Sequence, residues 1–467
     1  MFQTIIGAVS SFMYSKLLVI ILIGAGLYFT IRTRFPQVRL FERACESVME
    51  KPDDKEAISS FQALMVSTAS RVGTGNIVGV SSAICIGGFG SVFWMWVIAI
   101  IGSASALIES TLAQIYKKKG EDGKCYGGPA YYIEAALHCR PLAIVFCIAM
   151  ILTYAFGFNM LASYNLQSTF SGFSFYDVKW TPWIIGGILA LITGWCLLGG
   201  GSRIVKVTST LVPAMGVAYI LISVIVMIIN RAYLPVVFSK IISEAFDFKA
   251  IFGAFAGSAM MQGIRRGLYS NEAGIGSAPN ASASAQVSHP IKQGLVQMLS
   301  VFIDTLLLCT ATAMMCLSSG IAPAQELQGA PWVQAALHES LGNFGPLFIT
   351  VAMVLFAFTT LLGNCFYCDN LLNYIHKGQP SKTFMKGFRI VSALVVFIGA
   401  GMEVSMLWNI SDVLMGVMAL INIPVILILS NTALKALEDY EKQKKNGENP
   451  VFKTGNIGLE YETDYWS

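Results

Sequence analysis

The stretch Arg71-Val72-Gly73-Thr74-Gly75-Asn76 lies near the middle of an apolar segment, residues 58–86, that is long enough to cross a membrane. Each glycine costs about 1 kcal/mol in a helix interior relative to alanine, so Gly73 and Gly75 predict a break in this helix. Backbone released from a helix inside a bilayer needs polar partners, and it is therefore expected to line a cavity within the protein. The stretch predicts a membrane protein with a helix that unwinds at mid-membrane.

A second apolar segment, residues 247–274, carries a similar pattern five crossings later. It contains Gly253, Gly257 and Gly263, with Ser258 and Gln262 between them. Glycine-interrupted segments at matching places in two halves of a chain are the best sequence indication of a transporter site. The alternative is that Gly253 and Gly257, four residues apart, form a helix-packing motif. The polar side chains beside the glycines favour a binding site.

Two unwound helices suit a charged solute. The N-terminus of a half-helix presents free N–H groups and a partial positive charge to a carboxylate. Released carbonyl oxygens can replace the hydration shell of a cation such as Na⁺. A zwitterionic amino acid together with a cation matches this arrangement.

Composition excludes a water-soluble protein. Hydrophobic residues make up 55% of the 467 residues and charged residues only 12%, against about 25% in globular chains. The mean hydropathy is +0.63. The net charge of +4 is small, and no basic tract with interleaved aromatic residues indicates a nucleic-acid partner. Most of the surface is therefore expected to face a lipid bilayer.

About eleven apolar stretches are long enough to span a bilayer. They lie at 12–30, 58–86, 89–116, 141–170, 181–199, 204–229, 247–274, 293–318, 345–375, 387–404 and 408–430.

The basic residues predict the orientation. With eleven crossings, most of the 31 Lys and Arg residues fall in loops on one side of the membrane, together with the C-terminal tail. The other side holds only Lys16, Lys179, Arg231, Lys240 and Lys249. The positive-inside rule then places the C-terminus in the cytoplasm and the N-terminus outside. We expect a multi-pass protein of a bacterial inner membrane.

Charged residues at membrane depth are costly, and they indicate function. Arg71 and Asp304 both fall near mid-membrane and are expected to act as gating or buried charges. They could pair with each other, or each could meet helix-end carbonyls or water, and Asp304 could also bind a proton or a cation. Glu109 and Asp369 lie near cytoplasmic helix ends and are expected to be solvated.

The run Gly87-Gly88-Phe89-Gly90-Ser91-Val92-Phe93-Trp94-Met95-Trp96, followed by Gly102, resembles the signature of the alanine/glycine:cation symporter family, the sodium:alanine symporters. Ser91 stands where the family usually has Gly or Ala. The stretches 71–77, 127–133 and 267–278 are also similar to that family. The resemblance extends over nearly the whole chain.

The resemblance implies the all-α architecture of the amino acid–polyamine–organocation superfamily. One N-terminal helix would precede two inverted five-helix repeats, each with a broken helix, which agrees with the eleven crossings. Residues 1–57 would hold the first helix and a basic cytoplasmic loop, 58–230 and 231–431 the two repeats, and 432–467 a cytoplasmic tail.

Carried over residue by residue, the resemblance implies a binding site at the two broken helices. The substrate carboxylate would meet the Gly75 amide and its neighbours. The substrate-binding residues would be Gly73, Thr74, Gly75, Asn76, Gly257, Ser258, Met261, Gln262 and Asn364. Na⁺, the expected coupling ion, would bind the carbonyls of Ala69 and Val72 and the hydroxyls of Thr359 and Thr360. Adjacent threonines can instead form hydrogen bonds within their own helix.

One departure from the family concerns the substrate. The alanine-selective pattern often has Trp after Thr359-Thr360-Leu361-Leu362-Gly363, where this chain has Asn364. A Trp would narrow the pocket, whereas Asn leaves room and adds hydrogen-bonding capacity. The substrate is therefore expected to be alanine or glycine, or a larger amino acid such as glutamine.

Other classes of protein fit less well. The chain lacks the zinc-protease, hydrolase-elbow and phosphate-loop motifs, so neither an enzyme nor an ATP-driven pump is expected. Its ten cysteines are scattered along the chain and are expected to pack as small apolar side chains. Proton-coupled symport and, with less support, a passive solute channel stay open as alternatives to Na⁺ symport. The sequence indicates no oligomeric state.

Overall fold

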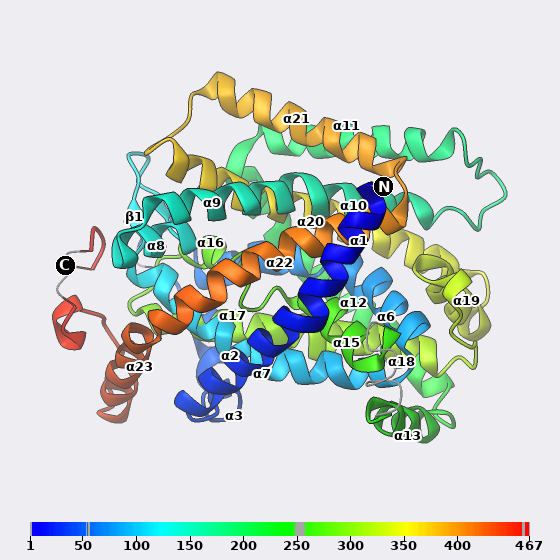
Figure 1. The fold of residues 1–467 in the computed structure, drawn as a ribbon, viewed down its shortest axis with the longest axis horizontal. Coiled ribbons are helices and arrows are strands. Elements are labelled where there is room, and N and C mark those ends of the chain that lie inside the picture. Colours follow the sequence, from blue (N-terminus) through cyan, green and yellow to red (C-terminus); the bar gives the residue numbers. More distant parts are fainter. Residues whose placement is uncertain (1, 53, 55–56, 248–256, 460–462, 467) are drawn as a thin grey trace.

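The computed structural model describes residues 2–52, 54, 57–247, 257–459 and 463–466. It is a bundle of long helices (Figure 1). Within those ranges, nine helical stretches are apolar and long enough to cross a membrane. They are built from α1 (Phe2–Phe12), η1 (Met13–Leu18) and α2 (Val19–Arg32); α7 (Gly90–Ile115); α9 (Arg140–Ile151), η3 (Leu152–Phe158) and α10 (Asn159–Ser168); α11 (Thr181–Leu198); α12 (Gly200–Ile229); α17 (Pro290–Val301), η5 (Phe302–Cys309) and α18 (Thr310–Leu317); α20 (Phe344–Ile375); α21 (Lys382–Ala400); and α22 (Val404–Ile428).

The two other predicted crossings are the glycine-interrupted segments. The first contains a break, and the second is described only from Gly257 onward, so the nine helices and these two segments together match the predicted eleven. Shorter elements connect them. These are α3 (Pro36–Arg39), α4 (Phe41–Val48), the antiparallel pair β1 (Lys118–Lys119) and β2 (Cys125–Tyr126), α8 (Pro129–Leu137), α13 (Leu234–Ala245), α16 (Pro279–Ser282), η6 (Gln325–Leu327), α19 (Ala330–Leu341), α23 (Ser430–Lys445) and η7 (Thr454–Ile457).

The first interrupted segment breaks where its glycines predict. Helix α5 (Ser60–Arg71) begins with a capping box in which Ser59 and Gln62 satisfy each other's backbone amides. It ends at Arg71 because Val72 adopts a non-helical conformation, with ψ of 86°. The chain resumes as the π-helical stretch η2 (Gly75–Gly79) and continues as α6 (Val80–Gly87). The predicted unwinding around Gly73 is confirmed.

The second interrupted segment is described only from Gly257 onward, so Gly253 lies outside the described residues. Ser258 caps the N-terminus of α15 (Ala259–Asn271), where its side chain accepts a hydrogen bond from the Met261 amide. Gly263 lies inside this helix rather than at a break. A methyl group there would overlap the Ser91 carbonyl of α7, so Gly263 permits close helix packing.

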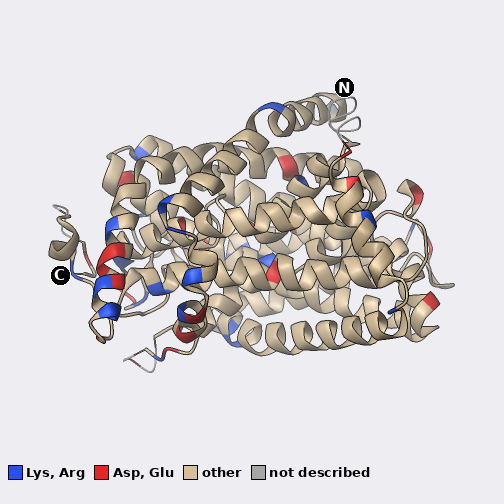
Figure 2. Cartoon of the chain, turned by 90° about the horizontal axis from the view of Figure 1, so that it is seen from below, with Lys and Arg blue, Asp and Glu red and all other residues tan. Residues whose placement is uncertain are grey.

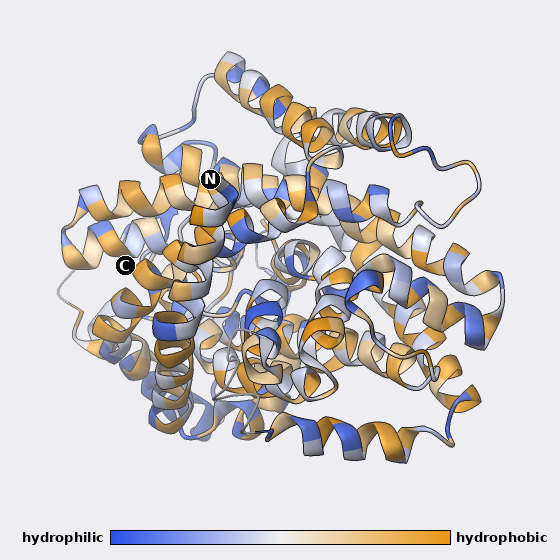
Figure 3. Cartoon of the chain, turned by 45° about the vertical axis from the view of Figure 1, so that its right-hand side comes forward, coloured by the Kyte–Doolittle hydropathy of each residue, from blue (hydrophilic) through white to orange (hydrophobic). Residues whose placement is uncertain are grey.

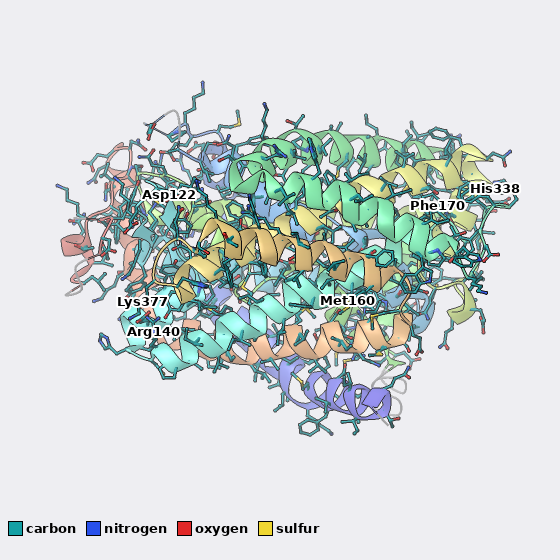
Figure 4. All side chains as sticks on the ribbon, turned by 90° about the horizontal axis from the view of Figure 1, so that it is seen from above. Asp122, Arg140, Met160, Phe170, His338 and Lys377 are labelled. Atoms are coloured by element: carbon teal, nitrogen blue, oxygen red, sulfur yellow. The ribbon has the colours of Figure 1, made fainter. Side chains whose placement is uncertain are left out.

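The two ends of the bundle differ in charge. One end, called the basic end below, carries α8, β1–β2, α23 and the C-terminal residues, and the opposite end carries α13 and α19 (Figure 1). Figure 4 shows Asp122, Arg140 and Lys377 at the basic end and Phe170 and His338 at the opposite end. Charged residues concentrate at the basic end and are sparse along the middle of the bundle (Figure 2).

The outer helices are rich in hydrophobic residues (Figure 3). Ile20 is 70% exposed and Leu191 is 76% exposed. Soluble monomers rarely expose large apolar surfaces, so this belt suits lipid. In the interior, α7 packs against α2, α15 and α17.

The C-terminal residues dock on the basic end. The Phe452 amide donates to the Ser288 carbonyl at 2.9 Å, and Trp466 Nε1 donates to the Gln114 carbonyl at 2.7 Å. Lys117 Nζ lies 3.7 Å from the centre of the Tyr465 ring, a cation–π contact. The tail therefore covers the ends of α7 and α17 instead of extending into solvent.

We expect Trp466→Ala to release this tail. The indole is only 6% exposed, and truncating a buried aromatic side chain costs about 3–5 kcal/mol. Hydrogen–deuterium exchange of purified protein should show faster exchange across 446–459, while the exposed Asp464→Ala control leaves exchange unchanged. Equal protection in both variants would show that Trp466 does not hold the tail.

Candidate functional site

The break in the first interrupted helix is held open by side-chain hydrogen bonds. The Gly73 amide donates to Asn76 Oδ1 at 2.9 Å, and the Asn76 amide donates to the Gly73 carbonyl at 3.2 Å. In a continuous helix these amides would instead bond to the carbonyls of Ala69 and Val72. The break therefore directs both donors away from the two carbonyls that sequence analysis assigned to Na⁺.

Asp304 anchors the break from the neighbouring crossing. Asn76 Nδ2 donates to Asp304 Oδ1 at 2.8 Å, while the hydroxyls of Ser270 and Thr305 donate to Oδ2 at 2.8 and 2.7 Å. The carboxyl group is fully buried and lies in the π-helical stretch η5. Such stretches often occur at functional sites. Asp304 thus joins the unwound segment, α15 and η5 at one point.

Arg71 does not pair with Asp304. Its Nη1 donates to Gln297 Oε1 at 3.3 Å, and it forms no ion pair within the described part of the chain. The guanidinium is only 2% exposed. The direct Arg71–Asp304 ion pair, which the sequence left open, is therefore absent among the described residues.

The two threonines of α20 face different ways. Thr359 Oγ1 donates to the Leu355 carbonyl at 2.9 Å within its own helix and lies 3.7 Å from Met215 Sδ in α12. Thr360 Oγ1 is buried without a hydrogen-bond partner among the described residues. A methyl group at Gly73 would overlap this oxygen, so the Thr360 hydroxyl lies against the unwound stretch.

Burying a polar group without a hydrogen bond is costly, so the Thr360 hydroxyl is a candidate for contact with a bound ligand. Thr360 Oγ1 lies against Gly73, and the released carbonyls of Ala69 and Val72 belong to the residues just before it, so all three are neutral oxygen atoms close to Gly73 in the chain or in space. Neutral and hard oxygen donors suit Na⁺. The described residues contain no cluster of His, Cys, Asp and Glu that could hold another metal.

The second half-helix runs alongside η2 and α6. Ring carbons of Tyr269 lie where a side chain at Gly75 would begin, and Gln262 lies against Gly87 near the far end of α6. Gln262 and Tyr269 are thus separated by about 10 Å along the axis of α15. The structure brings Tyr269 and Ser270, rather than Ser258 and Gln262, to the level of the break.

The other predicted substrate contacts lie in different surroundings. Gly257 is exposed, and no atom of the described residues lies within 4 Å of a methyl group placed on it. Met261 is buried in the apolar core. Thr74 lies in the break, where its hydroxyl accepts a hydrogen bond from Asn165 Nδ2 at 3.1 Å.

Asn364 joins the break through residues that sequence analysis missed. Ser70 Oγ lies 2.7 Å from Asn364 Oδ1 and 3.1 Å from Glu272 Oε1, and Asn364 Nδ2 donates to Asn159 Oδ1 at 2.9 Å. These hydrogen bonds link α5, α20, α10 and the end of α15. Ser70 immediately precedes the quoted 71–76 stretch, but no sequence pattern indicates its distant partners.

Glu109 was expected to be solvated, and this is wrong. It is fully buried in α7 and accepts hydrogen bonds from the backbone amides of Gly274 and Gly276 at 3.2 and 3.1 Å and from Asn422 Nδ2 at 2.8 Å. Both glycines have positive φ, of 82° and 87°, which lets the loop after α15 turn its amides onto the carboxyl group. The closely spaced glycines in 267–278 are the sequence feature that could have indicated this contact with Glu109.

Asp369 is partly exposed and pairs with Arg389 at 3.0 Å. It lines a cavity of about 780 Å³ that opens at the basic end. Polar side chains including Gln62, Asn280 and Asn370 line the cavity, which reaches Phe366, two residues from Asn364. A volume of this size is typical of small-molecule sites. The cavity therefore reaches the first turn of the broken helix at Gln62, and the residues of the break do not line it.

The comparisons with known proteins agree with this geometry. The model of the sodium:alanine symporter family matches residues 1–454. The amino-acid carrier protein AlsT of Bacillus subtilis (strain 168) is 44% identical over 457 residues, covering 98% of this chain and 96% of the relative. The sodium/alanine symporter AgcS of Methanococcus maripaludis is 35% identical, covering 95% and 98%. The probable sodium/glutamine symporter GlnT of Bacillus subtilis is 41% identical, covering 96% and 93%.

Among solved structures, MhsT in complex with L-phenylalanine superimposes with a TM-score of 0.56 at 14% identity, covering 83% of this chain and 93% of that chain. Its likeness supports the predicted fold. A bundle with a broken helix and a buried polar break defines a secondary active transporter. The chain belongs to the sodium:alanine symporter family.

Proposed function

We propose that this protein imports a small neutral amino acid together with Na⁺ by alternating access. The observation that carries the proposal is the unwound stretch at Gly73, with released carbonyls on α5 and the unpartnered Thr360 hydroxyl beside it. The names of AgcS and AlsT, a sodium/alanine symporter and an amino-acid carrier, agree with it.

In this proposal Na⁺ binds between Thr360 and the carbonyls of Ala69 and Val72, and it joins α5 to α20. The amide N–H groups from Gly73 to Gly75 receive the substrate carboxylate. Na⁺ thereby completes the site before substrate binds, and release of both toward the basic end follows when the helices rearrange. An inward gradient supplies about 2.3 kcal/mol per charge per 100 mV in addition to the concentration term.

The proposed topology places the basic end in the cytoplasm of a bacterial cell and the N-terminus outside. The concentration of Lys and Arg at that end supports it through the positive-inside rule (Figure 2). In this orientation the cavity next to Asp369 opens to the cytoplasm, and the proposal uses it as the path by which substrate leaves.

The function can be tested in proteoliposomes that contain the full chain. Labelled alanine, glycine and glutamine should each be offered with an inward Na⁺ gradient, with an inward proton gradient, and with neither. We expect concentrative uptake only with the Na⁺ gradient. Uptake with the proton gradient alone would favour proton coupling, and equilibration without any gradient would favour a channel.

Proton coupling has one specific observation in its favour, since Asp304 is a buried carboxyl group that bonds directly to the unwound segment. A relative, the sodium/proton-dependent alanine carrier protein of Bacillus sp. (strain PS3), is 33% identical, covering 88% of this chain and 94% of that protein. The proton-gradient arm of the uptake experiment separates the two possibilities.

We expect Asn364→Trp to narrow the substrate range. The indole would occupy space beside Ser70 and Asn159 and would remove the amide that joins them. Competition of labelled alanine by glutamine should weaken by about tenfold or more, while competition by glycine persists. If Asn364→Trp no longer transports alanine, competition cannot be measured in it. Asn364→Gln, which keeps the amide group, is then the second variant. Unchanged competition by glutamine in Asn364→Trp would remove this residue from the pocket.

A further inference from the structure

The outer face of the bundle carries a groove between α11 and α21, which lie side by side at its edge (Figure 1). The groove has a volume of about 530 Å³, and its lining is apolar except at one end. Its walls include Leu191 and Leu394, which are 76% and 54% exposed. This surface faces the bilayer in the proposed topology.

Two glycines of α11 give the groove its depth. A methyl group on Gly187 would reach only the edge of the Phe397 ring, at 3.8 Å, and one on Gly194 would reach Ala393 at 3.4 Å. Neither position is crowded, so larger side chains there would fill space that is now open. The glycines therefore hollow this face, whereas Gly263 permits tight helix packing.

The length of the groove matches one leaflet of a bilayer. It follows α11 from Gly187 to Leu198, a rise of about 16 Å. Half of a bilayer's hydrocarbon core is about 15 Å. One acyl chain lying parallel to α11 would therefore fit from the membrane surface to the midplane.

The basic end of the groove carries several cations. Arg389 lines the groove and pairs with Asp369, while Lys386, one turn earlier on the same face of α21, is exposed. Arg203 Nη1 donates to the Trp195 carbonyl at 2.9 Å, and its guanidinium carbon lies 4.8 Å from the Trp195 ring centre. Trp195 lines the groove, so its contact fixes Arg203 at the same end.

We infer that this groove is a binding site for an anionic phospholipid. One acyl chain lies along α11, and the phosphate of the head group meets Arg203, Lys386 and Arg389. Basic pockets between transmembrane helices at the cytoplasmic surface are suited to such head groups. Three cations against the single carboxylate of Asp369 leave a net positive charge at this point.

Charge also decides against a second copy of the chain as the occupant. A two-fold interface brings the same patch of both copies together. Because both copies share one orientation in the membrane, the cations at this end would face the cations of the partner. Like charges in contact are unfavourable, whereas an anionic head group neutralises them.

The test is native mass spectrometry of the full chain purified with mixed phosphatidylglycerol and phosphatidylcholine. We expect the wild type to retain phosphatidylglycerol preferentially. Each cation near a membrane surface contributes about 1 kcal/mol, which corresponds to about fivefold in binding. The double variant Arg203→Gln with Lys386→Gln should lose most of the preference, and Gly194→Leu should lose the bound lipid.

Two substitutions serve as matched controls. Lys51→Gln removes an exposed cation elsewhere, and Gly24→Leu adds a side chain on an exposed membrane-facing glycine with no atom within 4 Å. Both should retain phosphatidylglycerol as the wild type does.

Equal retention of the two lipids by the wild type, or equal loss in control and groove variants, would overturn the inference. A dimer that Gly194→Leu dissociates would assign the groove to a second copy. None of these readouts depends on transport, so the proposed function is tested separately.

Discussion

Gly75→Leu is expected to abolish amino-acid uptake while the protein still inserts and purifies. A side chain at Gly75 would begin 2.8 Å from Cε1 of Tyr269, so a leucine there would force the ring or the unwound backbone to move. The expected loss is about 100-fold or more, because substrate could no longer approach the amides of the unwound stretch. The measurement is Na⁺-driven uptake of labelled alanine in proteoliposomes matched for protein content.

Two glycine variants control for the added bulk. Gly79→Ala lies one turn further along the same segment, where a methyl group would be 3.9 Å from the Tyr269 ring, an ordinary contact. Gly24→Leu adds bulk on the lipid-facing side of α2. Both should transport at rates close to the wild type. Wild-type uptake by Gly75→Leu would remove the break from the binding site.

A second variant separates a blocked site from a simple clash with Tyr269. Gly75→Ala combined with Tyr269→Leu removes the ring that a methyl group would meet. If the backbone at Gly75 must stay bare to contact substrate, the double variant remains impaired. If it recovers full uptake, Gly75 is needed only for packing against Tyr269.

The sequence predicted the crossings and the first break because both signals are local. Hydrophobic length marks a crossing, and the closely spaced Gly73 and Gly75 mark a break without knowledge of any partner. Gly263, which was counted among the signs of a second break, lies inside a helix, and the same local reading explains the difference. A glycine in an apolar segment marks a break or a close helix contact equally well, and only the position of Ser91 on α7 decides which it is.

The polar network at the site could not be predicted, because its partners are far apart in the sequence. Ser70 meets Asn364 and Glu272, and Glu109 meets the amides of Gly274 and Gly276. The expectation that Glu109 is solvated used only its distance from the helix end. Its burial depends on a loop that folds back onto α7, which hydrophobic periodicity does not encode.

The threonine pair of α20 illustrates what the structure adds to the family resemblance. The resemblance gives Thr359 and Thr360 the same role as sodium ligands. Successive residues of a helix point about 100° apart, so both hydroxyls rarely face one site equally. Thr359 faces α12 at Met215, whereas Thr360 faces the break at Gly73. We therefore expect the two residues to differ in their effect on sodium binding.

Thr360→Val should raise the Na⁺ concentration needed for half-maximal uptake by about tenfold or more, whereas Thr359→Val should raise it by less than about threefold. Valine keeps the shape of threonine and removes one oxygen. An interaction with a charged group is worth about 1.5–3 kcal/mol, and 1.4 kcal/mol corresponds to a factor of ten in binding. Uptake of labelled alanine is measured as a function of Na⁺ concentration, with K⁺ replacing Na⁺ at constant ionic strength.

Saturating Na⁺ should restore most of the maximal rate in Thr360→Val, because the site is weakened rather than blocked. Equal Na⁺ dependence in Thr360→Val and the wild type would place the cation elsewhere, with the Asp304 carboxyl group as the next candidate.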